Sequence, residues 1–247
     1  MAIPRLFRSA YFRWPALRAL IGATNGLMRS RRVGTGYLAA YEEGEALGPL
    51  QRDEALLLHA LVRVTAPRTI VEFGFANGHS ALVFLEAGTR ETLVASYDID
   101  PVAAKRARRR FGNRGNFRLV QKSQADFDPA DIDGRPVDLA FIDASHDFDL
   151  NRRTFEKLLP ALADDAVVAV HDTGTWARAH MGPRIRAHLD SAEGRWIDAE
   201  RYAHAPGERR FVNWIASAHP AFGTLHLHSA HRLRHGLTLL QRRLELD

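Results

Sequence analysis

Short apolar runs alternate with amphipathic stretches along the chain from about residue 51. The runs with strand character are, in chain order, 69–73, 92–97, 117–120, 137–142 and 166–170. The stretches between them carry apolar residues at helical spacing, and one of these is the basic segment 101–111. Strands that alternate with helices are connected by right-handed crossovers, so we expect a parallel sheet with helices on both faces.

The C-terminal part of the chain has a different pattern. Two strand-like runs, 223–227 and 236–241, are separated by only eight residues, which is too few for a helical crossover between parallel strands. We therefore predict an antiparallel pair at one edge of the sheet. The complete prediction is an α/β fold with a Rossmann-like, doubly wound sheet of seven strands, mostly parallel, with an antiparallel C-terminal edge pair.

The first 50 residues differ in composition from the rest. Seven arginines precede the first acidic residue, Glu42, and are interleaved with aromatic and aliphatic side chains. We interpret residues 1–50 as a basic amphipathic helical extension or lid, and residues 51–247 as the main domain. Contact of the extension with an anionic membrane surface is an alternative, but one short basic helix is a weak anchor.

Composition narrows the protein class. The 247 residues are 46% hydrophobic and 26% charged, which is ordinary for a globular protein, and there is no cysteine for a disulfide or a thiolate metal site. No apolar run approaches the roughly 20 residues of a membrane span. We expect a cytoplasmic protein that acts on a small molecule, without a nucleic-acid partner, and homo-oligomerisation stays open.

The segment TIVEFGFANGHSA, residues 69–81, places a glycine-containing turn at the end of the first strand. Gly74 permits a sharp turn, and Gly78 lets a ligand or helix approach without a Cβ atom. About 20 residues further on, at the end of the second strand, Asp98 is placed to accept hydrogen bonds from both hydroxyls of a ribose. This combination predicts a nucleoside cofactor at the carboxyl ends of the strands.

Two cofactors compete for such a turn. Dinucleotide sites use the spacing G-x-G-x-x-G, whereas here the glycines are Gly74 and Gly78, with the acid Glu72 inside the strand end. Glu72 would repel a pyrophosphate but suits a cofactor with a cationic amine, which favours S-adenosylmethionine (SAM). An NAD-dependent oxidoreductase and a non-catalytic nucleoside-binding module are the alternatives.

The segment EFGFANGHS, residues 72–80, resembles the first motif of class I SAM-dependent methyltransferases, in the variant of the catechol-type O-methyltransferases. Four later segments also resemble that family, namely YDIDP at 97–101, KSQADF at 122–127, FIDASHD at 141–147 and VHDTG at 170–174. The resemblance covers roughly residues 50–175. It implies SAM as cofactor and methylation of a hydroxyl on a small molecule such as a natural product, sugar or phenolic compound.

The resemblance also implies a set of cofactor-binding residues. In it, Glu72 lies on the methionine amine side, Ser80 on the carboxylate, Asp98 on the ribose, and Ser123 and Gln124 on the adenine. The remaining members of the predicted cofactor site are Gly74, Phe75, Ala76, Gly78, Ile99 and Asp143.

His146 is the predicted general base. In the catechol-type relatives the residue matching Asp143 binds a divalent cation, and a lysine three positions later takes the proton; this chain has His146 there. A histidine titrates near pH 6.5, close to neutrality, which suits a base. The alternative for His146 is a structural role at the start of the following helix, including a bond to Asp147.

A divalent cation is predicted between Asp143 and the next strand end, His171–Asp172. Oxygen ligands suit Mg²⁺, whereas a histidine ligand admits Mn²⁺, Zn²⁺ or iron. The relatives have Asp-Asn or two acids in place of His171–Asp172, so this chain departs from the family pattern here. Two other roles for Asp143 therefore stay open, positioning of the cofactor and a structural role at the strand end.

Overall fold

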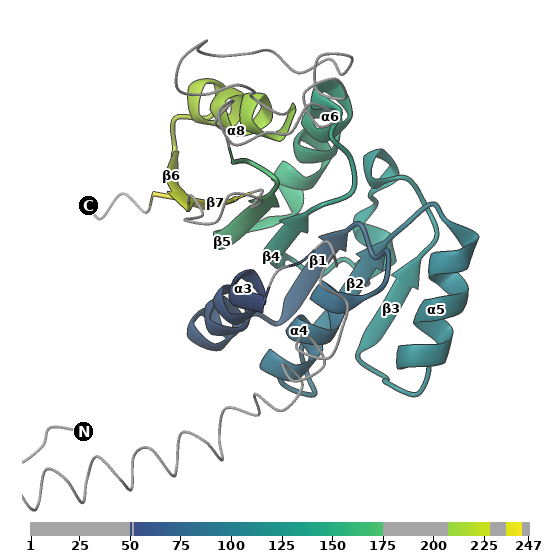
Figure 1. The fold of residues 1–247 in the computed structure, drawn as a ribbon. Coiled ribbons are helices and arrows are strands. Elements are labelled where there is room, and N and C mark those ends of the chain that lie inside the picture. The colour runs from purple at the N-terminus through teal and green to yellow at the C-terminus, as the bar shows by residue number, and fades with distance from the viewer. Residues whose placement is uncertain (1–49, 51, 175–206, 228–235, 244–247) are drawn as a thin grey trace, which may run out of the picture. The chain divides into compact units, whose positions relative to one another are not determined.

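The computed structural model describes residues 50, 52–174, 207–227 and 236–243 (Figure 1). The chain divides into two units, Met1–Arg52 and Asp53–Asp247, and the sheet lies in the second. The predicted N-terminal extension, residues 1–50, lies outside the described residues except for Leu50.

Seven strands and five α-helices are described. The strands are β1 (Thr69–Phe73), β2 (Leu93–Tyr97), β3 (Phe117–Val120), β4 (Val137–Ile142), β5 (Leu162–His171), β6 (Phe222–Leu227) and β7 (Leu237–Arg242). The α-helices are α3 (Arg52–Thr65), α4 (His79–Ala87), α5 (Pro101–Phe111), α6 (Phe148–Leu158) and α8 (Gly207–Ala218). Short 3-10 helices cover η2 (Gln124–Asp126), η3 (Pro129–Ile132) and η4 (Leu159–Ala161).

All seven strands form one sheet in the order β3-β2-β1-β4-β5-β7-β6. The first five in this order are parallel, and β7 pairs antiparallel with both β5 and β6. The predicted fold class, including the antiparallel C-terminal pair, is confirmed. The strand order reverses between β1 and β4, which is the position where ligands bind in open α/β sheets.

Two details differ from the predicted elements by more than one residue. β5 begins at Leu162, four residues earlier than expected, because Leu162 pairs with Val137 on the far side of a register shift. Helix α8 was not predicted, although its buried residues Phe211, Val212 and Ile215 have helical spacing.

Helices cover both faces of the sheet, α6 and α8 on one and α3 and α4 on the other (Figure 1). On the first face, the Phe155 ring of α6 packs edge-on against Phe211 of α8, with centroids 6.0 Å apart. On the second face, Phe84 of α4 packs against Phe141 of β4 at 5.6 Å. Within the described ranges, each helix is too short or too polar to span a lipid bilayer.

Candidate active site

A cavity of about 280 Å³ lies at the carboxyl ends of β1, β2 and β4, where the strand order reverses. It is lined by seven of the eleven predicted cofactor residues, which are Gly74, Ala76, Asp98, Ile99, Ser123, Gln124 and Asp143. The other four, Glu72, Phe75, Gly78 and Ser80, are not among its lining residues. The lining also includes Ser123 and Gln124, which follow β3, so the turns after four neighbouring strands contribute to one site.

The Asp98 side chain lines the cavity and also holds the turn after β1 by hydrogen bonds. One of its carboxylate oxygens accepts hydrogen bonds from the backbone N–H groups of Phe75 (3.2 Å) and Ala76 (2.9 Å), and the other accepts from Asp100 (2.9 Å). A carboxylate has about four acceptor positions, so one remains for a ribose hydroxyl, whereas the predicted contact uses both hydroxyls.

Replacing Asp98 with alanine should weaken binding of S-adenosylhomocysteine (SAH) by about 1.5–3 kcal/mol, the range for hydrogen bonds to a charged group. Calorimetry on the purified chain measures this. Asp100→Ala is the matched control, because Asp100 caps α5 by accepting from Val102 and is not a lining residue. Equal SAH affinity in Asp98→Ala and the wild type would remove Asp98 from the cofactor site.

The turn after β1 depends on backbone conformations with positive φ, at Gly74 (101°), Ala76 (45°) and Gly78 (74°). Two arginines of α5 brace it, since Arg106 donates to the carbonyl oxygen of Ala76 at 3.4 Å and Arg110 donates to that of Asn77. The basic run of this helix therefore contacts the cofactor turn, a role that its sequence did not indicate.

Glu72 is fully buried beneath this turn, where it accepts hydrogen bonds from the hydroxyls of Ser80 and Ser96. Burial raises the pKa of Glu72 to about 7. The hydroxyl of Ser80 is therefore engaged with Glu72, and Ser96 is a partner that the sequence interpretation missed. Contact of Glu72 and Ser80 with the methionine part of the cofactor stays a prediction.

The orientation of the Gln124 amide is fixed by a chain of hydrogen bonds. Asn151 of α6 donates through Nδ2 to the carbonyl oxygen of Ser145 (2.8 Å), so its Oδ1 faces Gln124 and accepts from Nε2 (2.7 Å). This leaves Gln124 Oε1 buried, with no hydrogen-bond partner among the described residues. A buried acceptor beside the cavity calls for a donor from the ligand, and the exocyclic amine of adenine is such a donor.

Replacing Gln124 with methionine should weaken SAH binding by about 0.5–1.5 kcal/mol, since it removes one neutral hydrogen-bonding group at similar length. The control is Gln121→Met, at an exposed position three residues earlier. Calorimetric Kd values that are the same for both variants would show that the Gln124 amide does not contact the base.

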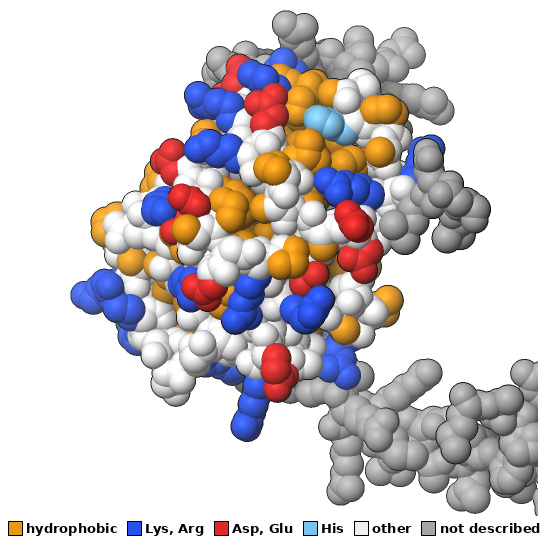
Figure 2. Space-filling view, turned by 180° about the vertical axis from the view of Figure 1, so that it is seen from behind, with side chains coloured by type: hydrophobic (Ala, Val, Ile, Leu, Met, Phe, Trp, Pro, Cys, Tyr) orange, Lys and Arg blue, Asp and Glu red, His pale blue; other side chains and the backbone are white. Residues whose placement is uncertain are grey.

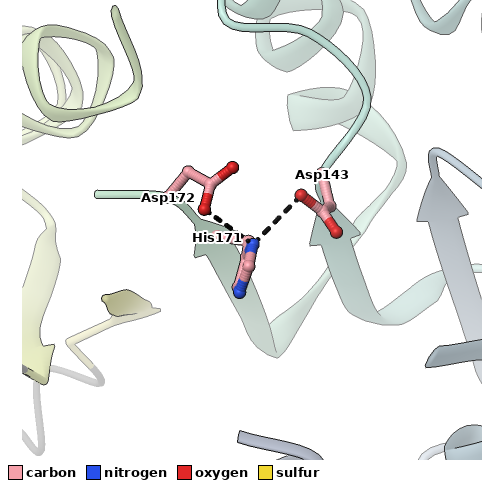
Figure 3. A group of neighbouring side chains, drawn as sticks. All are labelled: Asp143, His171 and Asp172. Atoms are coloured by element: carbon pink, nitrogen blue, oxygen red, sulfur yellow. Dashed lines mark hydrogen bonds and ion pairs between the residues drawn. The ribbon is translucent and has the colours of Figure 1, made fainter. Parts of the chain in front are cut away.

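The three predicted cation ligands lie together at the ends of β4 and β5 (Figure 3). His171 Nδ1 is 3.1 Å from one oxygen of Asp143 and 3.1 Å from one oxygen of Asp172. Burial by itself lowers the pKa of His171, but the charge of Asp143 and hydrogen bonds with three carboxylates raise it well above its ordinary value. The cluster therefore attracts positive charge strongly.

His146 lies one residue beyond Ser145, which lines the cavity. Its Nδ1 contacts a carboxylate oxygen of Glu208, a buried residue in the first turn of α8, and lies 3.9 Å from Asp172. The α8 backbone approaches closely here, because a Cβ atom on Gly207 would collide with the His146 carbonyl group. The sequence interpretation missed Glu208 as the partner of His146.

The hydrogen bond with Glu208 raises the pKa of His146 to about 9, against the opposing effect of burial. The His146 side chain is 77% exposed, whereas Glu208 is only 5% exposed, so the pair joins a solvent-facing imidazole to a buried carboxylate. With Nδ1 held by Glu208, Nε2 is the nitrogen that can accept a proton.

Residues 71–173 match the family model described as "Methyltransferase domain". A search of curated proteins found no match. Among solved structures, an O-methyltransferase from Bacillus cereus in complex with SAH is similar, with 18% identity, a TM-score of 0.58, and coverage of 86% of this chain and 90% of that chain.

Two further solved structures are similar. The O-methyltransferase TomG from Streptomyces achromogenes, in complex with SAM, has 18% identity and a TM-score of 0.55, with coverage of 83% of this chain and 86% of that chain. The cofactor-bound protein Rv0187 from MTB has 20% identity and a TM-score of 0.61, with coverage of 89% and 96%. At these identities the likeness establishes a shared fold.

Proposed function

We propose that this chain methylates a hydroxyl oxygen of a small molecule. The premise is that it is a class I SAM-dependent methyltransferase, whose methyltransferase domain matches at residues 71–173. The observation that carries this proposal is the pairing of His146 with the buried carboxylate of Glu208, one residue beyond the cavity lining. A hydroxyl must lose its proton when its oxygen takes a methyl group, so a positioned base suits this acceptor.

The cavity residues fit SAM. Asp98 offers a carboxylate for the ribose, Gln124 a buried acceptor for the adenine amine, and Ile99, 72% exposed, an apolar surface for the base. When bound, SAM supplies an activated methyl group on a sulfonium. The chain itself must then hold the acceptor in line, exclude water and receive the acceptor proton.

His146 would receive that proton on Nε2. The Glu208 carboxylate accepts from Nδ1, fixes the tautomer and stabilises the imidazolium that forms. Asp143, His171 and Asp172 are the residues that would hold a divalent cation, and such a cation would supply positive charge that lowers the pKa of a nearby hydroxyl.

We also propose a cytoplasmic protein without a nucleic-acid partner. Figure 2 shows Lys and Arg side chains interspersed with Asp and Glu on one face, with hydrophobic side chains between them. Such a mixture is typical of a solvated surface, whereas nucleic-acid sites gather basic residues on one face.

The test is turnover of methyl-labelled SAM with a panel of small hydroxyl compounds, followed by identification of the labelled product. We expect a methyl ether and one equivalent of SAH. Calorimetry with SAH and with NAD on the same preparation separates the enzyme classes. Binding of NAD without binding of SAH would overturn the methyltransferase premise, and SAH binding with label only on nitrogen or carbon would overturn the hydroxyl acceptor.

A further inference from the structure

A fourth residue, Glu54 of α3, completes the cluster at the ends of β4 and β5. Glu54 is buried, and its Oε2 lies 3.1 Å from Nε2 of His171. The His171 ring, 1% exposed, therefore has a carboxylate on one nitrogen and two carboxylates, from Asp143 and Asp172, on the other. These groups come from three separate parts of the chain.

Asp172, whose carboxylate contacts the His171 ring, has an unusual backbone conformation. Asp172 has a φ of 59°, a left-handed conformation that a non-glycine residue adopts at some cost and that Asp tolerates better than most. Residues held in such conformations gather at functional sites. In Figure 3 the carboxylates of Asp172 and Asp143 lie on either side of His171, and both contact the same ring nitrogen, Nδ1.

We propose that Glu54 is a positioning residue for a divalent cation bound by Nδ1 of His171 together with Asp143 and Asp172. A histidine that binds a metal almost always donates its other ring N–H to a carboxylate, carbonyl group or water, which fixes the tautomer and turns the remaining nitrogen toward the metal. The contact between Glu54 and Nε2 has this form. The inference rests on the proposed function in one respect, because the cation site and the proposed active site share the ends of β4 and β5.

The donor set also selects the metal. Mg²⁺ prefers six oxygen ligands in near-ideal octahedral geometry, whereas an imidazole nitrogen suits zinc, iron and other transition metals. Here one nitrogen and two carboxylates converge, so we infer that the site binds Mn²⁺, Fe²⁺ or Zn²⁺ more tightly than Mg²⁺. His171 is the residue that makes this difference, because an acid or amide in its place would offer only oxygen.

The test uses the full chain, freed of metal by chelation, titrated calorimetrically with Mn²⁺ alone and with Mg²⁺ alone, and followed by electron paramagnetic resonance of Mn²⁺. We expect one Mn²⁺ equivalent, with Mg²⁺ binding at least about 10-fold weaker. Glu54→Ala should weaken Mn²⁺ binding by about 10- to 100-fold, the usual effect of losing an outer-shell partner. Glu54→Gln, which keeps an acceptor for Nε2 but no charge, should give an intermediate value.

The matched control is Glu86→Gln, which removes an exposed carboxylate of α4 that pairs with Arg114. It should bind Mn²⁺ like the wild type. SAH affinity, measured on every variant, should stay within a few-fold of the wild type, which separates loss of the metal from loss of the fold.

Two results would overturn the inference. The first is unchanged Mn²⁺ affinity in both Glu54 variants. The second is no saturable Mn²⁺ binding to the wild type, with ¹H–¹⁵N spectra showing protons on both ring nitrogens of His171; the ring would then be an imidazolium that joins the carboxylates by itself. Neither measurement uses a methyl acceptor. If the chain binds Mn²⁺ but methylates no hydroxyl, the proposed function is overturned and the inference about Glu54 stands.

Discussion

Replacing His146 with alanine should slow methyl transfer by about 100- to 10,000-fold, the usual contribution of a positioned base, and leave SAM affinity nearly unchanged. The physical reason is that the acceptor hydroxyl loses its proton partner, while the cavity lining contains neither His146 nor Glu208. The measurement is kcat on an identified acceptor, with SAH affinity determined on the same variant.

The pH dependence of kcat provides the sharper test. Because the bond to Glu208 raises the pKa of His146 to about 9, the ring is mostly protonated at neutral pH and cannot accept a proton. The rate should therefore rise with pH through about 9, instead of near the unperturbed value of 6.5 that the sequence suggests. Glu208→Gln should move this rise toward lower pH, and His146→Ala should abolish it. Superimposable profiles for wild type and His146→Ala would show that His146 is only a helix-start residue.

Replacing Gly74 with alanine should lower the free energy of unfolding by about 2–5 kcal/mol, the combined cost of an unfavourable backbone conformation and of overpacking. Gly74 has a φ of 101°, and a Cβ atom there would lie 2.7 Å from the carbonyl carbon of Asp143. A side chain at position 74 would therefore collide with the backbone at the end of β4 as well as with any cofactor. The sequence interpretation did not foresee this collision with the backbone. Chemical denaturation measures the loss.

The control for Gly74 is Gly134→Ala. Gly134 also has a positive φ, 67°, but a Cβ atom there would meet nothing within 4 Å. Gly134→Ala should lower the free energy of unfolding only by the cost of the unfavourable backbone conformation, about 1–2 kcal/mol. If the two variants lose equal stability, the approach of the Asp143 backbone has no energetic importance.

The strands and helices of the fold could be predicted because the hydrophobic pattern that indicates them is local. β1, β3, β4 and α5 have the predicted bounds, since each is an apolar or amphipathic run between clear turn residues. The antiparallel pair at the C-terminal edge also followed from local information, the short connection between β6 and β7. The extra residues at the start of β5 did not, because they depend on pairing with β4 across a register shift.

The candidate site was predictable where a residue lies at or shortly after the carboxyl end of a strand. Asp98 and Asp143 directly follow β2 and β4, His171 is the last residue of β5, and Gln124 lies four residues beyond β3. The sheet brings these strand ends to one edge. Their partners come from helices, and their positions depend on how those helices pack. Glu54 is 117 residues from His171, Asn151 is 27 from Gln124 and Glu208 is 62 from His146. For Glu208 a signal existed in the helical spacing of Phe211, Val212 and Ile215, which would have placed an acid in the first turn of a helix.

The fixed direction of the Gln124 amide gives the site a means to tell one purine from another. Its buried Oε1 requires a donor from the ligand, and adenine presents an amine at position 6, whereas hypoxanthine presents a carbonyl oxygen there. Two facing acceptors would leave both oxygens without a hydrogen bond, and sites built around such a contact reject analogues that lack the donor strongly. Because Asn151 and the Ser145 carbonyl hold the amide, Gln124 cannot rotate to suit the other base. A deaminated cofactor, S-inosylhomocysteine, should therefore bind more weakly than SAH.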